Sequence, residues 1–178
     1  MKRAFNSIFL LMAMAILFVS NAKAGEREDN LVMLAMSGSV DGVRGLLDQG
    51  VDVNANDHFI GCTALVGAAQ YGKADVVRLL LARGADINAT GYGFTALTMA
   101  ALNGNADVVR ILIDNKADIN KKDAMGDTPL MKASRVLREG HRSGIDSVTH
   151  KTQFTPLTPA ETKTYTSIVQ MLLAAGAK

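Results

Sequence analysis

Three histidines and one cysteine are the residues of this chain best suited to bind a metal or haem: His58, His141, His150 and Cys62. Imidazole and thiolate groups are the usual ligands of zinc, of other transition metals and of haem iron. His141 and His150 are nine residues apart in a segment without helical periodicity, which fixes no ligand geometry, and no second cysteine or acidic cluster completes a site. We therefore expect no metal and no cofactor. A haem- or metal-handling protein that uses His141, His150 or Cys62 is the alternative hypothesis.

The sequence also contains no recognisable catalytic arrangement. It lacks the Gly-x-Ser-x-Gly turn that presents a nucleophilic serine, and it lacks a glycine-rich phosphate-binding loop. Asp52, Asp86 and Asp118 recur at equivalent places in the repeat described below, so they need no acid–base role. The single cysteine allows no internal disulfide. We predict that the protein is not an enzyme.

An internal repeat determines where the candidate residues named above lie in the fold. Residues 63–89 and 95–121 match at 16 of 27 positions with a spacing of 32 residues, which is typical of one supersecondary unit stacked on copies of itself. Each copy predicts a helix, a turn, a second helix and a loop. Thr63 and Thr95 are suited to accept hydrogen bonds from free N–H groups at a helix start, and Gly72 and Gly104 to end the first helix.

The second helix of each copy begins with an acidic residue. Asp75 and Asp107 precede the apolar runs, where a negative charge interacts favourably with the helix dipole. Gly84 ends the second helix of one copy, whereas Lys116 takes that place in the next. If Lys116 adopts a positive φ there, the strain costs about 1 kcal/mol.

These residues resemble the ankyrin repeat, in which a Thr-Pro-Leu-His-x-Ala start is followed by a glycine turn, a leucine-rich second helix and a Gly-Ala-Asp-x-Asn ending. Residues 128–130, Thr-Pro-Leu, keep that start, whereas Ala64 and Ala96 replace its proline. The resemblance implies an all-α solenoid of about four ankyrin repeats, each a helix-turn-helix plus a β-hairpin finger. The repeats cover approximately residues 29–57, 58–90, 91–123 and 124–178.

The last repeat is interrupted by a 27-residue insertion, at approximately residues 138–166. Thr158-Pro159-Ala160-Glu161 matches a capping box with proline at the first helical position, so the final helix should begin there and run about two turns longer than its predecessors. Residues 140–157 show no helical period. A binding loop and a tolerated, disordered insertion are both open interpretations of this segment.

Residues 1–24 have the pattern of a secretory signal peptide, with Lys2 and Arg3 before twelve apolar residues and a predicted cleavage after Ala24. Twelve residues span only about 18 Å as a helix, too short for a bilayer core of about 30 Å. We expect an ankyrin-repeat domain of residues 25–178, periplasmic or secreted, without a membrane span after cleavage. Its 16 basic and 17 acidic side chains give a net charge of −1, which does not favour nucleic acid as a partner.

The resemblance also implies a binding surface, because in this family the finger tips and the exposed face of the first helix commonly form a concave surface that grips a partner. Four of the six aromatic residues after position 24 fall on the corresponding positions of this chain. The positions carried over are His58, Phe59, Ile60, Cys62, Gln70, Tyr71, Tyr92, Phe94, Leu102, Asn103, Met125, Asp127, Arg135 and Val136. Cys62 and the two phenylalanines are also candidates for the core.

The first functional hypothesis is a non-catalytic, exported protein-binding module with one protein partner. Similar small exported ankyrin proteins suggest two sharper versions, an immunity protein that neutralises a toxin and an accessory factor of an oxidative-stress enzyme. The alternatives are the haem- or metal-handling protein and a secreted effector that acts on host proteins. We expect no nucleic-acid partner and a monomer.

Overall fold

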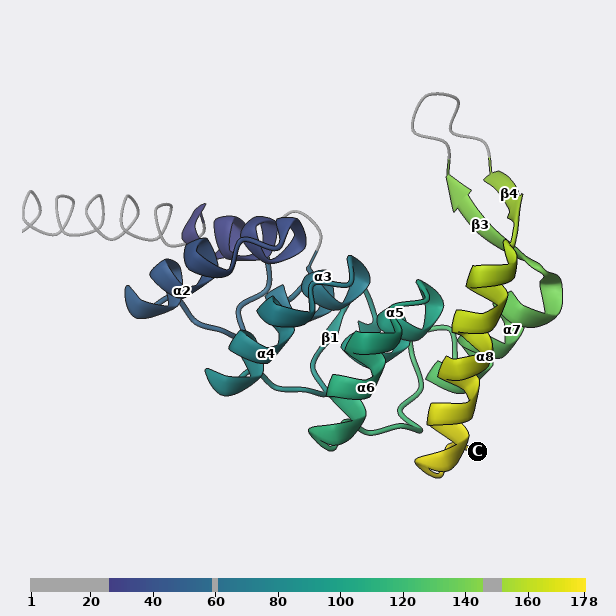
Figure 1. Cartoon of the computed structure of the whole chain (residues 1–178). Coiled ribbons are helices and arrows are strands. Elements are labelled where there is room, and N and C mark those ends of the chain that lie inside the picture. Colours follow the sequence, from purple (N-terminus) through teal and green to yellow (C-terminus); the bar gives the residue numbers. More distant parts are fainter. Residues whose placement is uncertain (1–25, 59–60, 146–151) are drawn as a thin grey trace, which may run out of the picture.

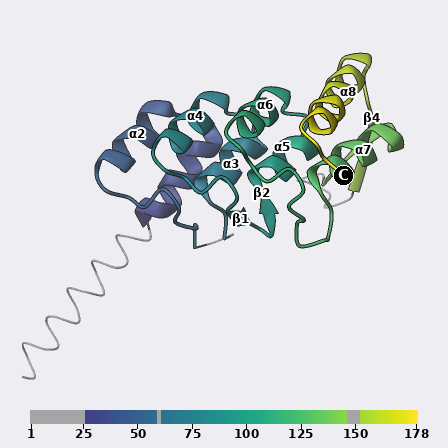
Figure 2. The same ribbon diagram turned by 90° about the horizontal axis from the view of Figure 1, so that it is seen from below.

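The protein is a row of helix pairs that stack side by side (Figure 1). The computed structural model describes residues 26–58, 61–145 and 152–178. Figure 2 shows that α2, α4 and α6 lie in one row and α3 and α5 in a second row beside it. Within the described residues, no helix is both long enough and apolar enough to cross a membrane. The segment predicted to be a signal peptide lies outside these residues.

Each unit contributes one helix to each row, which confirms the predicted all-α solenoid. The first unit is helical over residues 26–37. The elements that follow are α2 (Val40–Asp48), α3 (Ala64–Gln70), α4 (Ala74–Ala82), β1 (Thr90–Gly91), β2 (Phe94–Thr95), α5 (Ala96–Leu102), α6 (Ala106–Asp114), α7 (Pro129–Glu139), β3 (His141–Ile145), β4 (Thr152–Pro156) and α8 (Pro159–Ala174).

The first helices begin where threonine supplies a cap. The hydroxyls of Thr63, Thr95 and Thr128 accept hydrogen bonds from the backbone N–H three residues later, at 3.3, 3.1 and 3.3 Å. Each bond satisfies an N–H that has no partner within the helix. The predicted capping box at Thr158 and Glu161 is also present, and α8 begins at Pro159 as expected.

Small side chains let these helices pack closely. Ala68 and Ala69 of α3 and Ala100 and Ala101 of α5 are fully buried, as expected from the apolar stripe in each copy. Between units, the side-chain oxygen of an asparagine accepts a hydrogen bond from the backbone of the next unit, at Asp86 (2.7 Å), Asp118 (2.8 Å) and Lys178 (3.0 Å). The repeated residues therefore form both the core within each unit and the hydrogen bonds between units.

The fingers are less regular than the helices. The third finger is a two-stranded hairpin in which Thr90 pairs with Thr95 and Gly91 with Phe94, whereas the second has a single bridge between Asn56 and Thr63. The fourth finger is a turn held by the bond from Asp123 N to Asp127 O at 2.9 Å. The resemblance predicted a hairpin in every unit, and among the described residues of these three fingers only those of the third form two paired strands.

The insertion contains an antiparallel hairpin that the sequence pattern did not predict. β3 pairs with β4, and the hairpin extends from the ends of α7 and α8 (Figure 1). The interpretation of a wholly disordered insertion is therefore wrong for these two strands. Residues 146–151 between them lie outside the described residues. Short strands escape a search for helical periodicity because their order depends on the partner strand.

Candidate protein-binding surface

Two exposed tyrosines mark the surface beside α3. Tyr71 follows the last residue of α3 and is 52% exposed, while Tyr92 at the tip of the third finger is 41% exposed. Partial burial raises the pKa of Tyr92, with smaller contributions in the same direction from the nearby Cys62, Asp57 and Tyr71. Tyr92 N donates to Gly61 O at 3.4 Å, so the third finger lies beside the finger of the unit that contains Tyr71, although 21 residues separate the two tyrosines in sequence.

Tyr92 has a backbone conformation that disfavours it. Its φ is +56° and that of Gly93 is +78°, so both central residues of this two-residue hairpin turn are in the left-handed region. Turns of this kind favour Asn-Gly or Gly-Gly, because a residue with a Cβ pays roughly 1–2 kcal/mol for that conformation. A bulky aromatic residue is therefore held at the finger tip at a cost to stability, and its side chain remains substantially exposed.

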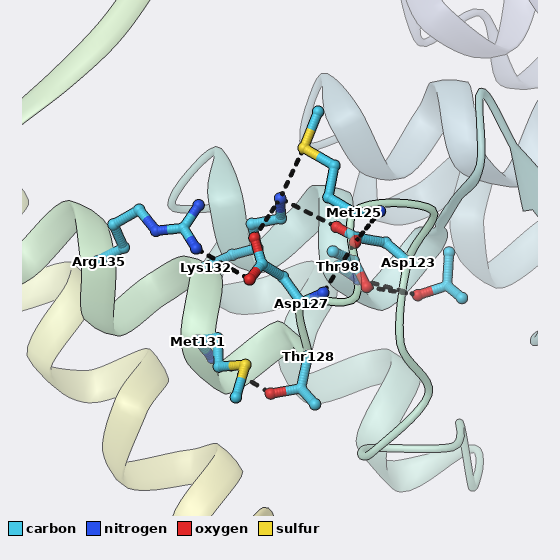
Figure 3. A network of polar contacts seen from close by, with 9 residues as sticks. Thr98, Asp123, Met125, Asp127, Thr128, Met131, Lys132 and Arg135 are labelled. Carbon is cyan, nitrogen blue, oxygen red and sulfur yellow. Dashed lines mark hydrogen bonds and ion pairs between the residues drawn. The ribbon is translucent and has the colours of Figure 1, made fainter.

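A buried lysine holds the fourth finger (Figure 3). The Lys132 ammonium of α7 lies 3.0 Å from Asp123 Oδ2 and 2.9 Å from Asp127 Oδ2, and its side chain is only 5% exposed. It also contacts Met125 Sδ at 3.5 Å and lies 5.3 Å from the centroid of the Phe94 ring, within range of a cation–π interaction. We call Asp123, Asp127 and Lys132 the finger-4 clamp.

Arg135 extends this cluster toward solvent. Its guanidinium donates to Asp127 Oδ1 at 2.8 Å, and the Arg135 side chain is 43% exposed. The hydrogen bond from Lys132 and the contacts with Arg135 lower the pKa of Asp127, although partial burial of the carboxyl opposes the shift. Asp123 Oδ1 meanwhile accepts from the backbone N–H groups of Met125 and Asp127, at 2.8 and 3.0 Å. The fourth finger is therefore fixed to α7 through charges.

The structure divides the fourteen predicted surface residues into several groups. Besides the two tyrosines, Met125 and His58 are exposed, and His58 Nδ1 lies 3.2 Å from Asp29. Phe59 and Ile60 lie outside the described residues. Partly buried positions are Gln70, Phe94, Leu102, Asn103, Asp127 and Arg135.

For two of the fourteen residues, the prediction of an exposed side chain is wrong. Cys62 is 0% and Val136 7% exposed, so neither presents a side chain to a partner. Cys62 precedes the Thr63 cap, and its thiol faces the core and donates to Thr63 O at 3.3 Å. Val136 lies within α7 and belongs to the buried core. Phe94 is less accessible than expected, since it packs against the core beneath Lys132.

Burial also makes Cys62 poorly suited to bind a metal. It raises the pKa of this thiol to about 12, which disfavours the thiolate that a metal or electrophile needs. No group of three or more His, Cys, Asp or Glu side chains suited to a metal occurs in the part of the chain that the structure describes. Of the insert histidines, His150 lies outside that part.

The clamp residues Asp123 and Lys132 were not recognised from the sequence. Their signal was a charged residue in a core position, because the two preceding units have Gly67 and Met99 where the fourth has Lys132. A lysine at such a position needs anionic partners to be buried. The finger just before it supplies them at Asp123 and Asp127.

Comparison with known sequences places the chain in a family. The sequence model of a family described as ankyrin repeats (3 copies) matches residues 8–91, 31–123 and 89–145. A search of curated protein sequences gave no significant match. The family matches cover more than half of the chain, and the stacked helix pairs, threonine caps and projecting fingers agree with them. The chain belongs to the ankyrin repeat family, whose members generally mediate protein–protein interactions.

Proposed function

We propose that the protein binds a single protein partner through the surface around Tyr71 and Tyr92, without catalysing a reaction. The observation that carries this proposal is the backbone of Tyr92. A strained residue with an exposed aromatic ring is better explained by recognition than by folding, since asparagine or glycine would fit the turn with less strain.

The chemistry of the pair supports a protein ligand. Tyrosine rings offer a large apolar contact area with two rotatable bonds, and each hydroxyl can hydrogen-bond to a backbone or side chain of the partner. Met125, which is 71% exposed on the next finger, adds a second adaptable apolar contact. We therefore expect Tyr71 and Tyr92 to form the centre of the interface and Met125 to lie toward its edge.

We further propose that the protein binds its partner after export from the cytoplasm. This rests on the basic start, the twelve apolar residues and the small residues at Ala22 and Ala24. Two partner classes follow from the family resemblance, a toxin that the protein neutralises and an oxidative-stress enzyme that it assists. Fractionation of cells that express the full chain tests this part: recovery outside the cytoplasm in a form lacking residues 1–24 supports it, and an uncleaved cytoplasmic chain contradicts it.

Affinity capture from the compartment that holds the protein tests the binding surface. The wild-type chain and a Tyr71→Ser, Tyr92→Gly variant serve as paired baits, with Lys116→Gly as a control because it removes the other non-glycine positive φ (+67°) on a different loop. We expect a stoichiometric partner with wild type and Lys116→Gly and its loss with the tyrosine variant. Equal capture by all three baits would exclude this surface.

A further inference from the structure

The two ends of the stack expose methionines at the positions where neighbouring units touch. A Cβ placed on Gly67 would lie 3.7 Å from Val32 Cγ1 of the preceding unit, which identifies these two positions as a contact between units. In the repeat register, Met33 of the first unit corresponds to Gly67, and Met131 of the last unit corresponds to Val32. The residue at the unit-to-unit contact is therefore apolar in both the first and the last unit of the stack.

Exposure separates these end residues from their counterparts inside the stack. The positions equivalent to Met131 are buried wherever another unit follows, with Val32, Val66 and Thr98 at 1%, 0% and 0% exposure, whereas Met131 is 46% exposed. Met33 is 67% exposed, while Met99 at the equivalent position is 8% exposed. Polar residues are expected at the ends of a repeat array, because the ends face water.

A second pair of positions lies at the boundary between neighbouring units. They are Ile113 of α6 and Met171 of α8, which line the same open groove. Their end-of-stack counterparts are Leu173, which is 53% exposed, and Gly45 in the middle of α2. A glycine inside a helix costs about 1 kcal/mol relative to alanine. A Cβ placed on Gly45 would meet no atom within 4 Å, so this glycine leaves room for a neighbour.

The charges of the two ends are also complementary. Residues 26–57 contain seven acidic and two basic side chains, whereas residues 121–178 contain five acidic and nine basic ones. Residues 58–120 carry five of each sign. The end with Met33 is therefore negative and the end with Met131 positive, so two copies attract each other head to tail and repel each other tail to tail.

We propose that the first unit of one copy stacks on the last unit of another, with Met33 against Met131 and Gly45 against Leu173. This heterologous contact uses different surfaces on the two copies, so it extends into linear oligomers as the protein concentration rises. The monomer expected from the sequence is then the form at low concentration only. The contact is separate from the surface around Tyr71 and Tyr92, so it stands or falls independently of the proposed partner.

Sedimentation velocity over a range of concentrations tests this stacking. The full chain is expressed, the recovered form is identified by its mass, and Met33→Lys and Met131→Lys variants are compared with wild type after circular dichroism has shown equal helicity. We expect the average mass of wild type to rise with concentration and the rise to shrink in high salt. Each single variant should lose association by at least about tenfold.

A mixture of the two variants tests whether the contact joins the first unit of one copy to the last unit of another. Met33→Lys keeps an intact last unit and Met131→Lys keeps an intact first unit, so an equimolar mixture should form a dimer and nothing larger. Gly45→Ala is expected to stabilise α2 and to weaken the association. A wild type that stays monomeric at all concentrations, self-association that persists in Met33→Lys, or a mixture that forms no dimer would each overturn the proposal.

Discussion

The third and fourth fingers occupy equivalent places in successive units, but different forces hold them. The third is a two-stranded hairpin with a strained tyrosine at its tip, and Phe94 is the residue that precedes its threonine cap. The fourth has no strand, and a buried lysine of α7 binds two of its carboxylates. A backbone bond from Ala124 N to Gly93 O, at 2.8 Å, joins the two.

This difference separates residues that hold the scaffold from residues that are available to a partner. In the fourth finger, the interactions of the clamp satisfy charges that burial would otherwise make costly. In the third, Tyr92 accepts strain and keeps its ring in water. Side chains that cost stability and stay exposed are better candidates for recognition than charged ones whose interactions are internal.

The largest effect is expected from Lys132→Ala. It leaves Asp123, whose side chain is 0% exposed, without the ammonium that neutralises it. Asp123 Oδ2 has no hydrogen-bond partner within the described residues, so only the two N–H bonds to Oδ1 would remain to stabilise the buried charge. Breaking a buried ion pair on one side costs about 3 kcal/mol. Urea denaturation measures this loss in the free energy of unfolding.

A second substitution controls for the lost side chain. Asp123→Asn in a Lys132→Met background removes the unpaired charge, keeps an oxygen for the N–H groups of Met125 and Asp127, and restores the residue type of Met99. We expect this variant to recover most of the lost stability. If Lys132→Ala costs less than about 1 kcal/mol, the clamp does not hold the fourth finger.

Acid should weaken the fourth finger before it affects the third. The pKa of Asp127 is lowered below its ordinary value of 3.8, so its stabilising contribution is complete above that value and is lost as the pH falls through the folded-state pKa. Stability measured between pH 5 and about 2 should fall more steeply in wild type than in Asp127→Asn. Equal slopes for the two proteins would show that Asp127 gains nothing from Lys132 and Arg135.

Tyr92→Gly should make the protein more stable. It relieves roughly 1–2 kcal/mol of strain, offset in part by the greater flexibility of glycine in the unfolded chain. Thermal unfolding should show a higher midpoint. A lower midpoint would mean that the tyrosine ring contributes more to the core than its 41% exposure indicates.

The smallest effect is expected from Lys116→Gly. Lys116 has a φ of +67°, and glycine removes about 1 kcal/mol of strain there. Its free energy of unfolding, measured beside that of Tyr92→Gly, shows whether strain is larger at the aromatic position. Stabilisation at Lys116 that exceeds the one at Tyr92 would remove the contrast between a functional and a tolerated strained residue.

The repeat allowed the scaffold to be predicted and left much of the surface open. Thr63, Thr95 and Thr128 cap helices as expected, and Lys116 has a positive φ because it stands where Gly84 does. Such residues have local roles that one unit specifies and the next repeats.

Other features depend on contacts that a repeat pattern does not contain. Cys62 proved to be core because its orientation depends on how the finger folds over α3. The strain at Tyr92 follows from the two-residue turn of the third finger, and the burial of Lys132 needs two carboxylates from a loop. The strands β3 and β4 pair with each other although residues 146–151 separate them in sequence. These are the places where units differ, and they include Tyr92, one of the two tyrosines at the centre of the proposed interface.

We propose that Tyr92 is kept for recognition at a cost in stability. Once a partner is captured, its dissociation constant should be measured by titration for wild type, Tyr92→Gly and Lys116→Gly, together with each protein's unfolding midpoint. We expect both variants to be more stable than wild type, with Tyr92→Gly binding at least about tenfold more weakly and Lys116→Gly binding as wild type does. Unchanged affinity in Tyr92→Gly would contradict the claim.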